Sequence, residues 1–211
     1  ENNPELAVWF NSYFPQLLAT FGKKYNFKLI HISTDCVFSG EKGNYIENSF
    51  KDGIGFYAQS KALGEVVNQK DLTLRTSIIG PELNENGIGL FHWFMNQKKE
   101  VNGYTNAIWS GVTTLVLAKT VGWAIENHIT GLYHVTNNKS IDKFSLLCLI
   151  NKHTKKNIII HKFINKESNK SFIDTRKEMN FTIPTYNEMV KFMIEDILKY
   201  KTKYQHYTIK R

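Results

Sequence analysis

The stretch Leu29-Ile30-His31-Ile32-Ser33-Thr34-Asp35 joins a short, largely apolar run to three consecutive polar residues. An apolar run of this length with polar residues after it predicts a buried strand of a parallel sheet over residues 29–33. Parallel sheets bind their ligands beyond the carboxyl ends of their strands. The hydroxyl of Thr34 is therefore expected at a ligand-binding edge.

A second stretch, Phe56-Tyr57-Ala58-Gln59-Ser60-Lys61, opens a helix that we expect to reach about residue 69. Tyr57 and Lys61 are four residues apart, so they share one face of this helix. A hydroxyl at a strand end and a Tyr/Lys pair on the next helix suit proton transfer to a carbonyl beside a nicotinamide ring. An ordinary surface pair is the alternative, because this spacing arises by chance about once in a chain with 10 tyrosines and many lysines.

Predicted helices and strands alternate along the rest of the chain. Asn3 is expected to cap a helix that starts at Pro4, continues to about residue 25 and is kinked at Pro15. Further strands are expected over residues 72–79, 131–136 and 158–161, and further helices over residues 90–96, 113–125, 142–152 and 186–198. The last helix carries one apolar stripe, which predicts core packing. This alternation predicts an α/β fold with a doubly wound parallel sheet of the Rossmann type, covered by helices on both faces.

Composition excludes several classes of protein. With 211 residues, 42% of them hydrophobic and 13% aromatic, the chain can bury a core and is not a disordered protein. No apolar run approaches the roughly 18 residues that span a bilayer, so we expect a cytoplasmic protein with no membrane partner. Cys36 and Cys148 lie far apart, which favours free thiols over a disulfide framework. No metal site is expected, because the seven histidines show no metal-ligand spacing.

The net charge of +8 favours anionic partners. The basic residues are spread along the chain, so a small phosphorylated substrate and a dinucleotide are expected in preference to nucleic acid. No Gly-x-Gly-x-x-Gly loop joins a strand to a helix, although such a loop brings a helix N-terminus to a dinucleotide's pyrophosphate. We therefore expect the chain to begin part-way through a dinucleotide-binding domain, and to bind NAD(P)H weakly or not at all by itself, so whether it is active alone stays open.

Five motifs, in order, resemble the extended short-chain dehydrogenase/reductases, and most closely the dTDP-4-dehydrorhamnose reductases. They are Asn3-Pro4-Glu5-Leu6-Ala7; Ser33-Thr34-Asp35 with Val37-Phe38 and Gly40; Tyr57-Ala58-Gln59-Ser60-Lys61 with Gly64-Glu65; Arg75-Thr76-Ser77; and Ser171-Phe172-Ile173-Asp174-Thr175-Arg176 with Ile183-Pro184-Thr185-Tyr186. Each motif is moderately specific, and their order along nearly the whole chain makes the resemblance strong.

The resemblance implies NADPH- or NADH-dependent reduction of the 4-keto group of a nucleotide-activated 4-keto-6-deoxy sugar, in the biosynthesis of deoxysugars and cell-surface polysaccharides. It implies a Rossmann portion over residues 1–79 and 105–136, and a smaller sugar-nucleotide lobe over residues 80–104 and 137–211. The implied partner is a dTDP- or UDP-linked sugar. A homodimer is one assembly to expect, and the oligomeric state stays open.

The resemblance also implies roles for individual residues. Tyr57 would donate the proton, Lys61 would stabilise the phenolate and bind the nicotinamide ribose, and Thr34 would hydrogen-bond the ketone oxygen. The implied cofactor-binding residues are Ser33, Tyr57, Lys61, Thr76 and Ser77. The implied substrate-binding residues are Asp35, Cys36, Val37, Phe38, Ile78 and Trp109. Phe38 as a core residue, and Trp109 as packing between the lobes, are the structural alternatives.

Departures from the family pattern keep other functions open. Relatives often have an aromatic residue at Cys36 and a tryptophan at Ile78, so the sugar is not fixed, and an N-acetylated or UDP-linked sugar is an alternative. Dehydration is disfavoured, because the dehydratases of this superfamily place a glutamate after the aspartate that Asp35 matches. Epimerases use the same Tyr/Lys pair. A partner-binding protein that resembles the beta regulatory subunit of methionine adenosyltransferase would have the fold without turnover.

Overall fold

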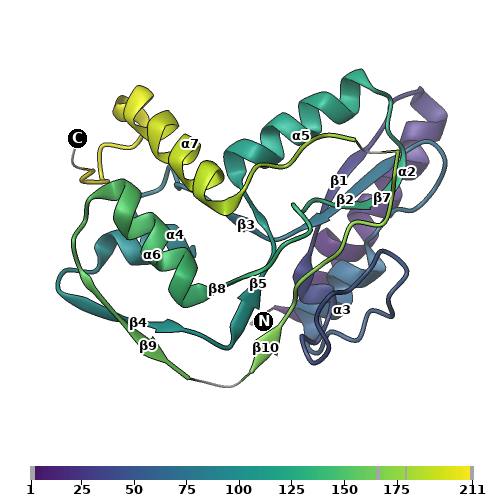
Figure 1. Cartoon of the computed structure of the whole chain (residues 1–211). Helices are drawn as coiled ribbons and strands as arrows, with labels where there is room; N and C mark the ends of the chain where they lie inside the picture. Colours follow the sequence, from purple (N-terminus) through teal and green to yellow (C-terminus); the bar gives the residue numbers. More distant parts are fainter. Residues whose placement is uncertain (1–2, 165–166, 179, 210–211) are drawn as a thin grey trace.

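The computed structural model of the protein contains a three-stranded parallel sheet in the order β1-β2-β7 (Figure 1). The structure describes residues 3–164, 167–178 and 180–209. The strands are β1 (Ile30–Thr34), β2 (Leu72–Thr76) and β7 (Gly131–His134), and Thr34 pairs with Thr76 at the carboxyl end. Every residue of β2 is buried, as expected for the middle strand of a parallel sheet.

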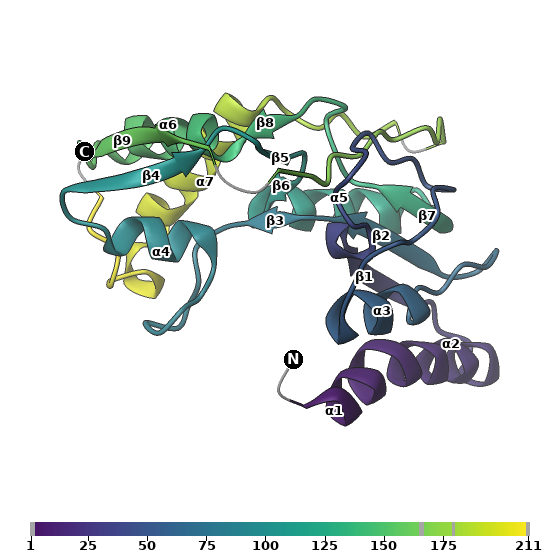
Figure 2. The same ribbon diagram turned by 90° about the horizontal axis from the view of Figure 1, so that it is seen from below.

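Helices cover both faces of this sheet. Figure 2 shows α2 (Phe14–Tyr25) and α3 (Phe56–Leu63) on one face and α5 (Thr114–Glu126) on the other. The hydroxyl of Thr113 caps α5 by accepting a hydrogen bond from the Val116 amide at 3.4 Å, which confirms the predicted start of this helix. The predicted parallel α/β arrangement is confirmed.

The first helical segment begins at the predicted cap. The side chain of Asn3 accepts a hydrogen bond from the Leu6 amide at 3.0 Å, and α1 (Pro4–Val8) follows. A π-helical turn over Trp9–Tyr13 then leads into α2. The irregular turn lies before Pro15, because a proline has no N–H to donate to the preceding turn.

Two sequence-based boundaries were wrong. Helix α3 ends at Leu63 and not near residue 69, with Gly64 as its C-cap. The predicted strand over residues 72–79 divides into β2 and β3 (Ile78–Ile79), and β3 pairs with β6 (Val112–Thr113) in a different sheet. The division falls at Ser77, whose carbonyl accepts a hydrogen bond from the Val112 amide at 2.9 Å.

The remaining described elements include small sheets and three helices. Strands β4 (Glu100–Tyr104) and β9 (Ile159–Phe163) are parallel partners. Strand β5 (Ala107–Trp109) lies between β10 (Ser168–Asn169) and β8 (Ile141–Asp142). The helices are α4 (Leu90–Asn96), α6 (Lys143–Thr154) and α7 (Tyr186–Lys199), close to their predicted ranges. Two short 3-10 turns cover Asp35–Val37 and Lys201–Lys203.

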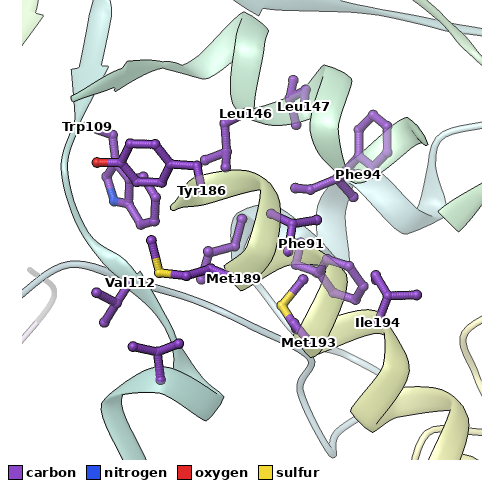
Figure 3. Close-up of a cluster of buried hydrophobic side chains, with 14 of the residues drawn as sticks. Phe91, Phe94, Trp109, Val112, Leu146, Leu147, Tyr186, Met189, Met193 and Ile194 are labelled. Carbon is purple, nitrogen blue, oxygen red and sulfur yellow. The ribbon is translucent and has the colours of Figure 1, made fainter. Parts of the chain in front are cut away.

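The apolar stripe of α7 packs into a hydrophobic core together with α4 and α6, as predicted. Figure 3 shows Met189, Met193 and Ile194 of α7 among aromatic side chains of α4 and leucines of α6. A capping box holds the start of the helix: the Thr185 hydroxyl accepts from the Glu188 amide, and the Glu188 carboxylate accepts from the Thr185 amide at 2.9 Å.

No described helix is long and apolar enough to cross a membrane. The predicted division of the chain into two lobes stays a prediction. Strand β5 lies where the two parts meet along the sequence, and it pairs with strands that come after residue 140.

Candidate active site

Thr34 and Tyr57 converge at the carboxyl end of β1. Thr34 is the last residue of β1, and its hydroxyl accepts a hydrogen bond from the Cys36 amide and donates one to Asp35, each at 3.2 Å. Tyr57 lies in the first turn of α3, and its side chain is partly open to solvent at 45% exposure. The Thr34 hydroxyl lies close enough to the Tyr57 phenol to lower its pKa. The structure therefore brings together the two hydroxyls that the sequence singled out.

The surroundings of Tyr57 keep its phenol protonated. Burial raises the pKa of Tyr57, and the Thr34 hydroxyl opposes that rise. The negative charges of Cys36 and Asp35, when present, raise the pKa further. A protonated phenol at neutral pH is a proton donor and not a base.

Lys61 lies one helical turn after Tyr57, against β1. Its ammonium donates a hydrogen bond to the Ile32 carbonyl at 2.9 Å. Burial lowers the pKa of Lys61, and the Glu65 carboxylate opposes the change. Burial, Thr34, Cys36 and Asp35 are the causes of the shift in the Tyr57 pKa.

Ser33, one of the expected cofactor residues, belongs to a buried ion-pair network. Its hydroxyl donates to Glu65 at 2.6 Å, and Arg75 reaches the same carboxylate through Nε at 2.8 Å and Nη2 at 2.7 Å. Thr76 donates to the Val135 carbonyl at 3.0 Å and is buried, while Ser77 is partly exposed. The hydroxyls of Ser33 and Thr76 are thus already engaged within the protein.

The expected substrate residues fall into two groups. Asp35, Cys36 and Ile78 are at least partly exposed, with Ile78 at 51%. Val37, Phe38 and Trp109 are buried. The Phe38 ring stacks on Tyr45 with centroids 4.1 Å apart, and Trp109 packs against Tyr186 at 5.7 Å. Packing thus favours the structural alternative for both aromatic residues.

Two cavities open near these groups. One of about 390 Å³ is lined by Cys36, Gly40, Tyr57 and Lys170, with others. The second, of about 700 Å³, lies between α4, β4 and α6. Its lining includes Trp93, Gln97, Glu100, Asn102, Tyr104 and Lys143.

Lys143 is a site residue that the sequence did not reveal. It is the first residue of α6, and its ammonium lies 5.0 Å from the centre of the Trp109 ring. Burial lowers the pKa of Lys143 to about 8, and the Asp35 and Cys36 charges oppose that change. The pairing of β8 with β5 brings α6 to this place, and no local sequence pattern signals such a long-range contact.

No metal centre lies within the described part of the chain, where no group of three His, Cys, Asp or Glu residues is placed to hold an ion. The site is therefore a set of hydroxyl, phenol and ammonium groups at the edge of a parallel sheet.

A model of one protein family, described as the RmlD substrate binding domain, matches residues 1–207. No curated protein sequence matches this chain. Among solved structures, a dTDP-4-dehydrorhamnose reductase from Clostridium acetobutylicum superimposes with a TM-score of 0.79 at 22% identity, over 94% of this chain and 76% of that chain.

Two further structures share the fold. The dTDP-4-dehydrorhamnose reductase of Bacillus anthracis in complex with NADP has a TM-score of 0.76 at 20% identity, covering 88% of this chain and 72% of that chain. The UDP-glucose 4-epimerase of Thermotoga maritima with UDP-glucose has a TM-score of 0.72 at 16% identity, covering 94% and 72%. These likenesses confirm the Rossmann-like fold expected from the sequence.

Proposed function

The chain belongs to the RmlD substrate binding domain family, and we propose that it reduces the 4-keto group of a nucleotide-activated 4-keto-6-deoxy sugar with NAD(P)H. Family and fold together support a role as a sugar-nucleotide oxidoreductase. The observation that carries the finer proposal is the meeting of Thr34 and Tyr57 at the carboxyl end of β1.

In this proposal Tyr57 is the general acid. Its phenol, protonated at neutral pH, donates its proton to the sugar oxygen as negative charge develops there. The Thr34 hydroxyl, which accepts from the Cys36 amide at 3.2 Å, turns its hydrogen from the Asp35 carboxylate to the same oxygen and orients the ketone. A prearranged donor of this kind is worth about 10²–10³-fold in rate. A nicotinamide cofactor, when bound, supplies the hydride.

The residues present fit the nicotinamide end of such a cofactor. The Lys61 ammonium uses one N–H on the Ile32 carbonyl at 2.9 Å, which leaves two donors for ribose hydroxyls beside Tyr57. Ser77 is partly exposed and remains a proposed cofactor contact. For Ser33 and Thr76, that role would require exchanging their present partners, Glu65 and the Val135 carbonyl. The sequence has no Gly-x-Gly-x-x-Gly loop, so we assign no residue to the pyrophosphate.

On the substrate side, we assign Asp35, Cys36 and Ile78 to the sugar. These side chains are at least partly exposed, and they come shortly after the carboxyl ends of β1 and β2. Val37, Phe38 and Trp109 support the site from beneath by packing. NADPH and NADH both remain candidate cofactors; the reductase from Bacillus anthracis was crystallised with NADP.

The test is turnover of dTDP- and UDP-linked 4-keto-6-deoxy sugars by the full chain, followed by NAD(P)H absorbance and product analysis. Tyr57→Phe should lower kcat about 10²–10⁴-fold. Tyr25→Phe, which changes an exposed phenol on α2, is the matched control and should leave kcat unchanged.

Three outcomes would overturn the proposal. Unchanged turnover in Tyr57→Phe would remove its acid. Binding of both the sugar nucleotide and NAD(P)H without turnover would favour a binding protein. Epimerised product without net NAD(P)H consumption would favour the activity of the epimerase with the same fold.

A further inference from the structure

Lys143 is a cation without an anionic partner in the described part of the chain. Its side chain is half-buried beside Trp109, a residue only 4% exposed. No carboxylate of the described residues lies within 4.0 Å of its ammonium. Taking a charge out of water is costly unless an opposite charge or hydrogen bonds replace the water. The indole face offsets only part of that cost.

The neighbouring acidic groups do not neutralise Lys143. Glu100 lines the same cavity, but its carboxylate pairs with His161 at 2.9 Å. Asp35 influences Lys143 electrostatically from beyond ion-pair distance, and its carboxylate accepts a hydrogen bond from Thr34 at 3.2 Å. The ammonium therefore keeps donors that can bind an anion.

The surroundings of Lys143 indicate which class of anionic ligand it can bind. It lines the cavity of about 700 Å³, whose walls include the aromatic side chains of Trp93 and Tyr104. The charges of Asp35 and Cys36, which directly follow Thr34 in the chain, also act on its ammonium. Lys143 thus combines the wall of an aromatic-lined space large enough for a nucleoside with an electrostatic link to the residues that follow Thr34.

A nucleoside-diphosphate sugar has the same linear order: base, ribose, diphosphate, hexose. With its hexose at Thr34 and Tyr57 and its base in the cavity, the diphosphate falls at Lys143. Lysine binds phosphate oxygens as a compact point charge. Resting on the proposed function, we infer that Lys143 binds the diphosphate of the sugar nucleotide and positions the hexose for Tyr57.

Binding measurements on the full chain test this inference without turnover. The probes are dTDP, UDP and uncharged thymidine, measured by calorimetry with the wild type, Lys143→Met, Lys143→Arg and Lys152→Met. Lys152 is an exposed lysine on the same helix and serves as the matched control. We expect Lys143→Met to weaken dTDP and UDP binding about 10- to 100-fold and thymidine less than twofold. Lys143→Arg should keep most of the affinity, and Lys152→Met all of it.

Three results would overturn the inference: dTDP affinity within twofold of wild type in Lys143→Met, an equal loss for thymidine, or no binding of dTDP to the wild type. Unfolding curves of Lys143→Met and Lys143→Arg exclude a folding defect as the cause. In turnover assays, Lys143→Met should raise KM more than it lowers kcat, whereas Tyr57→Phe should lower kcat. If Tyr57→Phe leaves turnover intact while Lys143→Met still weakens dTDP binding, the proposed reaction fails and the diphosphate site stands.

Discussion

Arg75 holds Glu65 in a buried two-point ion pair, with Nε and Nη2 at 2.8 and 2.7 Å from the two carboxylate oxygens. Glu65 follows the end of α3, and Arg75 belongs to β2. The pair therefore ties the helix that carries Tyr57 to the middle strand of the sheet. Two of the motifs that resemble the reductase family, Gly64-Glu65 and Arg75-Thr76-Ser77, meet in this contact.

Arg75→Met should lower the free energy of unfolding by about 3–5 kcal/mol, because it leaves the Glu65 carboxylate buried without its main partner. The double variant Glu65→Met/Arg75→Met should recover part of this loss, since no unpaired charge remains. Urea unfolding of the three proteins measures the effect. Lys51→Met is the control: Lys51 reaches Glu65 at 3.2 Å from a partly exposed position, and its loss should cost less than about 1 kcal/mol. Equal losses in the single and double variants would contradict this account.

Gly64 is required by a close backbone approach. A Cβ atom at Gly64 would lie 1.7 Å from the Asn11 carbonyl oxygen, so the π-helical turn before α2 could not dock against α3. Gly64→Ala should cost at least about 1–3 kcal/mol of stability. Gly122→Ala on α5 is the matched control, because no atom lies within 4 Å of its added methyl group, and it should stabilise by about 0.5–1 kcal/mol. Thermal unfolding of both variants checks the opposite signs.

Features with a local cause could be predicted from the sequence. The cap at Asn3, the cap at Thr113 and the buried stripe of α7 follow from side-chain chemistry and periodicity over a few residues. The meeting of Thr34 and Tyr57 could be predicted because a strand end and the following helix are constrained by chain connectivity. The family expected from the five motifs is confirmed over residues 1–207.

Features set by distant contacts could not be predicted. The close packing of Gly64 depends on Asn11, and the division between β2 and β3 depends on Val112. The burial of Trp109 depends on Tyr186, which comes much later in the chain. Lys143 reaches the site through strand pairing of β8 with β5. In each case the deciding partner lies tens of residues away.

Asp174 and Glu47 give the protein a predictable dependence on pH. Burial raises the pKa of Asp174 to about 7, and a hydrogen bond with Glu47 acts in the same direction. Burial acts to raise the pKa of Glu47. The pKa nevertheless lies below its usual range, because the hydrogen bond from Thr175 and the charge of His134 lower it. The folded protein therefore keeps a proton on Asp174 that the unfolded chain releases near its ordinary pKa of 3.8. This contribution to stability is complete below about pH 4 and is lost as pH rises through about 7.

Asp174→Asn should remove this dependence, because the amide resembles the protonated acid and still accepts from the Arg176 amide, now at 3.0 Å. Relative to wild type, the variant should gain stability as pH rises from about 5 to about 8. Urea unfolding across that range measures the difference. Glu85→Gln, which changes an exposed loop carboxylate, is the control and should leave the pH dependence of the unfolding free energy as in wild type. A constant difference between Asp174→Asn and wild type at all pH values would contradict the assignment.

The hydroxyl of Thr34 should matter for turnover in a way that its packing does not. Thr34→Ser keeps the hydroxyl that meets Tyr57 and should retain kcat within about tenfold, whereas Thr34→Ala should lower kcat about 10²–10³-fold. Because the Thr34 hydroxyl lowers the pKa of Tyr57, its removal should raise that pKa. The phenol then stays protonated to higher pH, so the alkaline decline of kcat in Thr34→Ala should move to higher pH.

Thr20→Ala, at an exposed position on α2, is the control and should leave both the rate and the pH profile unchanged. Loss of the hydrogen bond from the Cys36 amide to Thr34 should cost about 1 kcal/mol of stability, so the profile is measured where both variants are fully folded. A rate loss in Thr34→Ala with an unmoved alkaline limb would mean that Thr34 acts on the sugar oxygen without acting on Tyr57.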